Sequence, residues 1–130
     1  MATAEQHREI SLQFLDHAED ELRKGDLLQA SEKAWGAVSH FVNSVARQRN
    51  WPLGSHRQLI ENANRLINQD PANASQRRRL LLSIEALHAN FYHAHLDEVL
   101  VGEGIEGAKE LIRDLEDLNR YTSEMNTTTD

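Results

Sequence analysis

The chain has 130 residues, of which 39% are hydrophobic and 27% charged, and its formal net charge is −7. This length is enough for one domain with its own core, and no apolar run approaches the roughly 20 residues of a transmembrane helix, so no membrane partner is expected. The absence of cysteine excludes disulfides, thiolate catalysis and cysteine-ligated zinc. Because the N-terminus also lacks the features of a secretory signal, a cytoplasmic protein is expected.

Two helices are predicted from the spacing of apolar residues in the first part of the chain. The first covers about 4–24 and ends at Gly25, which is typical of a helix C-terminus. The second covers about 27–49 and follows Asp26, a suitable N-cap. Its predicted buried face consists of Leu27, Ala30, Ala34, Val38, Phe41, Val42 and Val45.

Three more helices are predicted after the break at Pro52 and Gly54. Ser55 with Gln58 forms a capping-box signature for a third helix over about 56–68. A loop is expected around Pro71, a fourth helix over about 75–100, and a fifth over about 105–121. The sequence therefore predicts an all-α, antiparallel bundle of four or five helices in a single domain, 1–122, with a disordered polar tail over 123–130.

The charge is divided into blocks along the chain. Residues 1–26 have a net charge of −4, residues 27–79 hold eight bases and three acids, and residues 80–130 hold eleven acids and three bases. An acidic average disfavours diffuse binding to nucleic acid, but the basic block in the middle could bind a phosphate locally. The alternative is that these charges form solvated helix faces.

Histidines on the predicted fourth helix are the first candidates for a site. His88, Tyr92 and His95 stand at i, i+4 and i+7, so they are expected to project from one face. Such a group could bind a metal, transfer a proton or hold a phosphate. No HExxH pattern accompanies it, so no metal is expected, and histidines hydrogen-bonded in the core or at an interface are the alternative.

The second helix adds Trp35 and His40 to this group. Trp35 precedes Gly36, which weakens a helix unless another backbone approaches it closely. Close packing on Gly36 and a ligand groove beside Trp35 both agree with this pattern. The candidate ligand pocket consists of Trp35, His40, His88, Tyr92 and His95.

A basic loop around the Trp-Pro-x-Gly hinge is the second candidate site. Guanidinium and imidazole groups there stand near the start of a helix, whose backbone N–H groups suit an anion. The indole of the hinge could also stack on a base. The candidate phosphate or nucleic-acid contacts are Arg47, Arg49, Trp51, His56 and Arg57. Residues 77–79, three arginines, are expected to open the fourth helix against its dipole, which favours an acidic partner surface or a phosphate.

Three segments, ASEKAWGAVSH, NWPLGSHRQL and ALHANFYHAHL, together with a short acidic last helix, carry a family resemblance. The set resembles the HEPN superfamily of small helical bundles, and within it the PaREP-type proteins, over roughly residues 10–120. The resemblance implies an antiparallel bundle that is commonly a homodimer. Members serve as partners of nucleotidyltransferases, as ribonuclease toxins, or as modules of unknown role.

Catalytic HEPN members carry an Arg-x4–6-His motif near the start of the last long helix. No arginine stands at that spacing before His88, and the one matching pair, Arg49 and His56, spans the hinge instead. We therefore expect no catalytic residue and no cofactor, but a binding module that engages a protein partner or a nucleotide. The alternative is a metal-independent endoribonuclease that uses Arg49 with His56, or His88 with His95 as an acid–base pair.

Overall fold

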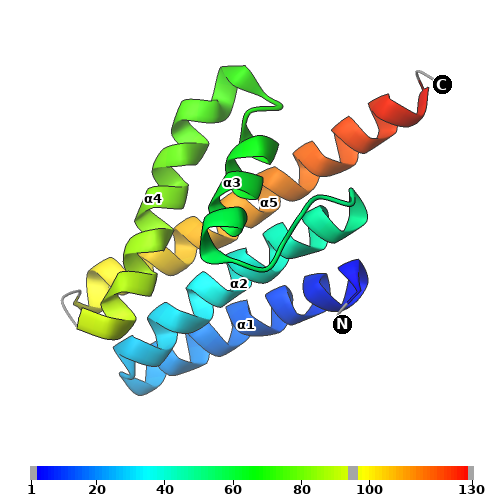
Figure 1. Ribbon diagram of the computed structural model, residues 1–130. Helices are drawn as coiled ribbons and strands as arrows, with labels where there is room; N and C mark the ends of the chain where they lie inside the picture. Colours follow the sequence, from blue (N-terminus) through cyan, green and yellow to red (C-terminus); the bar gives the residue numbers. More distant parts are fainter. Residues whose placement is uncertain (1–2, 94–96, 129–130) are drawn as a thin grey trace.

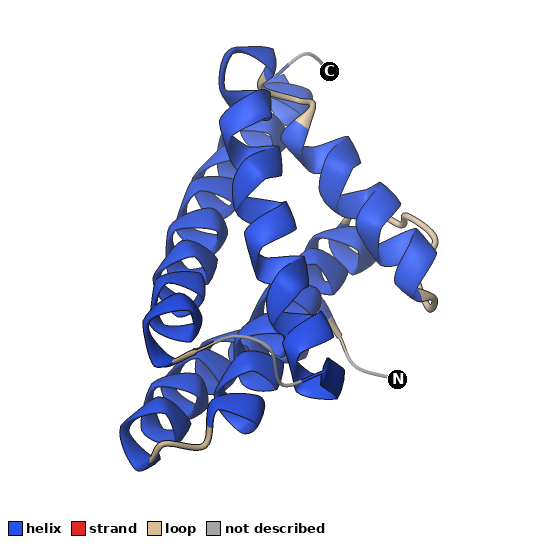
Figure 2. Cartoon of the chain, turned by 90° about the vertical axis from the view of Figure 1, so that its left-hand side faces the viewer, coloured by secondary structure: helices blue, strands red, loops and turns tan. Residues whose placement is uncertain are grey.

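The computed structural model describes residues 3–93 and 97–128, and every regular element in these ranges is a helix (Figure 1, Figure 2). In chain order the helices are α1 (Ala4–Lys24), α2 (Leu27–Gln48), α3 (His56–Ile67), α4 (Pro71–His93) and α5 (Glu98–Thr128). The predicted all-α helical bundle is confirmed. Within the described ranges, none of these helices combines the length and the apolarity that crossing a bilayer requires.

The turn between α1 and α2 makes these two helices an antiparallel hairpin. Gly25 adopts the left-handed conformation there, with φ 84°, and its N–H is bonded to the end of α1. Asp26 caps α2 by accepting a hydrogen bond from the backbone N–H of Gln29 at 3.1 Å. Both predicted helix boundaries are confirmed.

The central helix of the bundle is α2, which contacts each of the other four. In Figure 1, α1 lies below α2, α3 and α4 lie above it, and α5 crosses behind α3. The predicted core face of α2 is confirmed at six of its seven positions, whereas Leu27 is only partly buried. Side chains of α5 complete the core, among them Ile105, Leu111 and Leu115, which are fully buried.

α4 begins at Pro71, four residues before the predicted start, so the expected loop is wrong in part. Proline has no backbone N–H to lose in the first turn of a helix, which makes it a suitable first residue. Asp70, directly before it, accepts hydrogen bonds from Asn73 at 2.9 Å and from Arg77 at 2.8 Å. These two donors lower the pKa of Asp70. The three arginines at 77–79 therefore lie beyond the first turn and do not open the helix.

α5 begins at Glu98, although the sequence predicted that the fourth helix would continue to residue 100. Asp97 explains the difference, because its carboxylate accepts a hydrogen bond from the N–H of Leu100 at 2.9 Å and so caps a new helix. Val99, in the first turn of this new helix, is 66% exposed. The helix extends to Thr128, beyond the expected end at residue 121, and disorder of 123–130 stays a prediction.

Gly102 and Gly104 fall in the gap between the predicted fourth and fifth helices, but both lie inside α5. Gly104 is buried against α4, where a Cβ atom would stand only 2.6 Å from Cδ2 of Leu87. This close approach of two helices requires a glycine, so packing keeps the helix intact where composition alone favours a break.

Candidate functional site

Three helices bring Trp35, His56 and His88 together in one cluster of three mutually contacting rings, here called the histidine stack. The indole of Trp35 in α2 lies 5.1 Å from the imidazole of His88 in α4, with 28° between the planes. The His88 ring lies 5.7 Å from that of His56, the first residue of α3, with 20° between the planes. Because Trp35 is 5% exposed and the side chain of His56 is 51% exposed, the stack runs from the core to the surface.

Each imidazole of the histidine stack faces a carboxylate. Nε2 of His56 lies 3.4 Å from Oε1 of Glu85, and Nδ1 of His88 lies 3.3 Å from Oε2 of Glu32. A carboxylate that accepts a hydrogen bond from an imidazole fixes the orientation of the ring, which suits proton transfer. The same two carboxylates disfavour a phosphate at this place. Among the residues that the structure describes, no group of three or more His, Asp or Glu side chains is arranged to hold a metal ion.

His40, which the sequence grouped with Trp35 and His88, instead contacts α1. Its Nδ1 lies 3.0 Å from Nδ1 of His7, and its ring meets Phe14 edge-on at 5.2 Å. Burial lowers the pKa of both histidines; the Arg47 guanidinium lowers the pKa of His7 further, and the charge of His7 lowers that of His40. A hydrogen bond between two Nδ1 atoms needs one of them unprotonated, so the contact is suited to a neutral pair.

Two further members of the predicted pocket are not placed. Tyr92 belongs to α4, but its side chain lies outside the described residues, and so does the whole of His95. Their grouping with Trp35 and His88 stays a prediction.

The hinge residue Trp51 lies against two guanidinium groups. The Cζ atom of Arg49 is 5.3 Å from the ring centroid of Trp51, and that of Arg65, from the last turn of α3, is 4.3 Å from it. Burial lowers the pKa of Arg49, and the nearby charge of Arg65 lowers it further. Both contacts have the geometry of a cation–π interaction, which compensates part of the repulsion between the two cations.

The hydrogen-bond partners of Arg49 are all uncharged. Its guanidinium donates to Oδ1 of Asn119 at 3.0 Å, to Oγ1 of Thr122 at 2.5 Å and to Oε1 of Gln69 at 2.9 Å. Among the side chains that the structure describes, no carboxylate lies within ion-pair distance, 4.0 Å, of the guanidinium of Arg49 or of Arg65. Both arginines face a cavity of ≈ 400 Å³, here called the arginine pocket, lined by Arg49, Trp51, Arg65, Gln69 and Ser123.

The other members of the predicted basic site lie elsewhere. Arg57 is exposed and forms an ion pair with Glu61 at 3.1 Å, while His56 belongs to the histidine stack. Arg47 is half-buried, and its Nε is buried without a hydrogen-bond partner. Sequence reasoning placed Arg49 and Trp51 together but missed Arg65, whose approach depends on how α3 folds back over the hinge.

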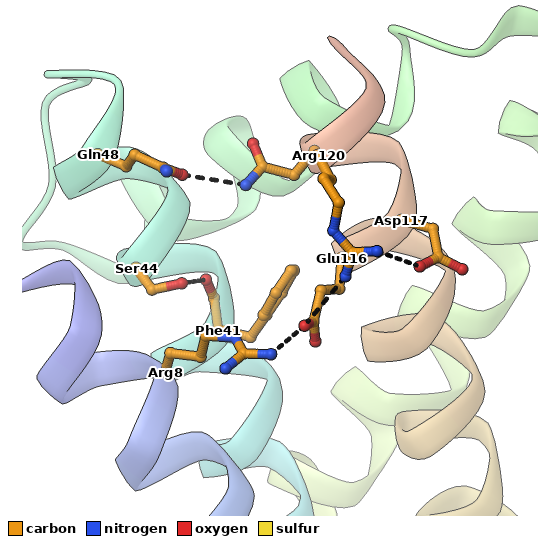
Figure 3. Close-up of polar contacts among 8 residues, drawn as sticks. Arg8, Phe41, Ser44, Gln48, Glu116, Asp117 and Arg120 are labelled. Atoms are coloured by element: carbon orange, nitrogen blue, oxygen red, sulfur yellow. Dashed lines mark hydrogen bonds and ion pairs between the residues drawn. The ribbon is translucent and has the colours of Figure 1, made fainter. Parts of the chain in front are cut away.

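A second polar cavity, of ≈ 510 Å³, lies between α1, α2 and α5. Figure 3 shows that Arg8 and Arg120 reach Glu116 from opposite sides, and that Arg120 also faces Asp117, at 3.8 Å. Because Glu116 and Asp117 pair with the two arginines here, this cavity is less suited to an anion than the arginine pocket.

A family model described as the archaeal PaREP1/PaREP8 family matches residues 6–112. No curated protein and no solved structure matches the chain. The matched range contains the whole histidine stack and all of the arginine pocket except Ser123.

Proposed function

This chain belongs to the archaeal PaREP1/PaREP8 family, and we propose that it acts as a non-catalytic, HEPN-type binding module that holds a phosphate-bearing ligand, such as a nucleotide, in the arginine pocket. The observation that carries this proposal is the pair of guanidiniums, Arg49 and Arg65, on one indole. No carboxylate among the described side chains pairs with either of them, although the chain holds 21 acids and only 14 lysines and arginines. Two adjacent cations are unfavourable by themselves, and an anion between them removes that cost.

The chemistry of the pocket suits a phosphate group. Guanidiniums present N–H donors in a planar fork that matches phosphate oxygens. Arg49 is held in place by its uncharged partners, and Gln69 and Ser123 supply further polar groups around the ≈ 400 Å³ cavity. Trp51 is only 8% exposed, so the proposal assigns recognition to the phosphate rather than to a base stacked on the indole.

Thermal unfolding in phosphate, or with a nucleoside diphosphate, against chloride at equal ionic strength tests this function. A ligand that binds the folded state alone raises its stability, by about 2.7 kcal/mol at a hundred times its Kd. We expect this gain for the natural chain and for Arg57→Gln, which removes an exposed arginine outside the pocket. Arg65→Gln should abolish it, and an equal gain in all three proteins would refute the proposal.

A second candidate function is metal-independent RNA cleavage at the histidine stack. It is favoured by one observation, the 5.7 Å separation of the His56 and His88 rings, each beside a carboxylate. One imidazole would take the proton of a ribose 2′-hydroxyl as that oxygen attacks phosphorus, and the other would protonate the departing 5′-oxygen. This function is secondary because the Arg-x4–6-His motif is missing before His88 and because Glu32 and Glu85 repel a phosphate.

Cleavage of a single-stranded RNA by the purified chain tests the second candidate. Loss of cleavage in both His56→Ala and His88→Ala would support it, provided that His17→Ala, a change at an exposed histidine of α1, retains the activity. Rates that are the same in all four proteins would exclude it.

Homodimerisation and a nucleotidyltransferase-type partner protein are two further parts of the proposal, and both rest on the HEPN resemblance. The chain mass is 14.8 kDa, so light scattering distinguishes a monomer from a dimer directly. A monomeric mass at every concentration tested would contradict the first part.

A further inference from the structure

The proposed function leaves a groove between α4 and α5 unused. A hollow of ≈ 600 Å³ and a second of ≈ 340 Å³ share Leu80, Glu103 and Gly107 in their walls, so the two form one continuous groove. We call it the glycine groove. Its small and apolar lining includes Leu80, Ala86, Leu87, Gly102, Gly104 and Gly107.

Packing within this chain does not account for two of the three glycines. A Cβ atom at Gly102 would stand 3.6 Å from Leu22, and one at Gly107 would stand 3.7 Å from Leu80, which are ordinary contact distances. Glycine weakens a helix relative to alanine. At these two positions it therefore lowers helix stability although an alanine side chain would fit without a clash. What they provide is an open floor, over which another backbone can approach α5 closely.

Large apolar side chains border the same groove. Val99 and Leu100, in the first turn of α5, line it and are 66% and 48% exposed. Adjacent large apolar residues that remain this exposed beside an apolar hollow are typical of an interaction surface.

Four glutamates stand along the groove, Glu98, Glu103, Glu106 and Glu110. Of these, only Glu106 has an ion-pair partner among the described side chains, Lys109 at 3.1 Å. Such a rim attracts lysine and arginine side chains. It also opposes a symmetric contact with a second copy of this chain, because that contact would set one acidic rim against the other.

We propose that the glycine groove binds a cationic amphipathic helix of a different protein. The apolar side chains of that helix enter between α4 and α5, and its lysines and arginines pair with the glutamate rim. The groove shares no lining residue with the arginine pocket, so the two sites can be tested separately.

Binding of a fluorescent peptide of leucine and lysine, about 18 residues long and spaced as an amphipathic helix, tests the proposal on the full chain. A scrambled peptide of the same composition carries the same charge without an apolar face. We expect the amphipathic peptide to bind at least about tenfold more tightly than the scrambled one. Equal affinities would overturn the proposal, because they would show attraction by charge alone.

Two groups of variants locate the binding site. Glu103→Lys with Glu110→Lys should weaken binding at least about tenfold, whereas Glu9→Lys with Asp16→Lys, at exposed acids of α1, should change it less than about threefold. Leu100→Asp should also weaken binding; its added negative charge by itself attracts the peptide, so a loss reports the missing apolar contact. Unchanged binding in these groove variants, or a dimer of the natural chain that dissociates in Glu103→Lys with Glu110→Lys, would overturn the proposal.

Discussion

The imidazole rings of His56 and His88 lie nearly parallel, 5.7 Å apart, although they belong to different helices. Both rings also contact the indole of Trp35, at 5.5 and 5.1 Å, so one cluster fastens α2, α3 and α4 to each other. This arrangement has a structural consequence that does not depend on any reaction: α3 is short, and the stack is one of its anchors at the N-terminal end.

Replacement of His88 tests this anchoring role. His88→Ala removes the ring that contacts both Trp35 and His56, together with the contact to Glu32, and aromatic pairs contribute about 0.5–1.5 kcal/mol each. We expect the free energy of unfolding in urea to fall by roughly 1–3 kcal/mol. The exposed His17 provides the control, since His17→Ala should stay within about 0.5 kcal/mol of the natural chain. Equal stability of the two variants would show that the stack does not hold α3.

The helix pair α1–α2 depends on Gly36. A Cβ atom at this position would lie 2.4 Å from Cδ2 of Phe14, so Gly36→Ala forces the ring or the helix to move. We expect a loss of about 1–3 kcal/mol, typical of overpacking. Gly107→Ala is the matched control: its Cβ atom meets nothing closer than 3.7 Å, and alanine favours the helix by up to about 1 kcal/mol. Opposite shifts of the urea midpoint are therefore expected, and shifts of the same sign would contradict this account.

The pair His7–His40 should make stability depend on pH. Burial lowers the pKa of both histidines in the folded state. The charge of Arg47 lowers the pKa of His7 further, and the charge of His7 lowers that of His40. As the pH falls through about 6.5, the ordinary histidine pKa, the unfolded chain therefore takes up protons that the folded chain does not. Stability is fully present above that pH and decreases below it.

Urea unfolding at pH 7.5 and at pH 5.5 measures this effect. His40→Gln should lose less stability on acidification than the natural chain, because one depressed group is gone. His17→Gln should lose as much stability on acidification as the natural chain. If His40→Gln also loses that much, the His7–His40 pair is not the cause of the pH dependence.

Sequence reasoning succeeded where the determinants are local. Gly25 and Asp26 end one helix and begin the next through bonds that reach three or four residues, and Ser55 caps α3 by accepting from the N–H of Gln58 at 3.0 Å. The junction of α4 and α5 could not be predicted in this way. There Gly104 is a breaker by composition, but its contact with Leu87 of another helix retains it inside α5.

In the candidate sites too, contacts between neighbours in the chain were predicted, whereas contacts between different helices were not. Arg49 and Trp51 are neighbours in the chain, and the sequence placed them together. The approach of Arg65 to Trp51, and that of His56 to His88, depends on where α3 lies after the hinge. No pattern within one helix carries that information, so the sequence assigned His56 to the wrong neighbours.

The two arginines of the arginine pocket should respond differently to replacement, because only one of them also ties helices together. Arg49→Gln removes hydrogen bonds to Asn119 and Thr122 of α5, and we expect it to cost about 1–3 kcal/mol in urea unfolding. Arg65→Gln loses a cation–π contact but relieves repulsion of Arg49, so its stability in chloride should change by less than about 1 kcal/mol. In phosphate at the same ionic strength, neither variant should gain what the natural chain gains. A full gain in Arg65→Gln would show that the anion does not bind in the arginine pocket. An Arg49→Gln variant as stable as the natural chain would contradict only the structural role of Arg49.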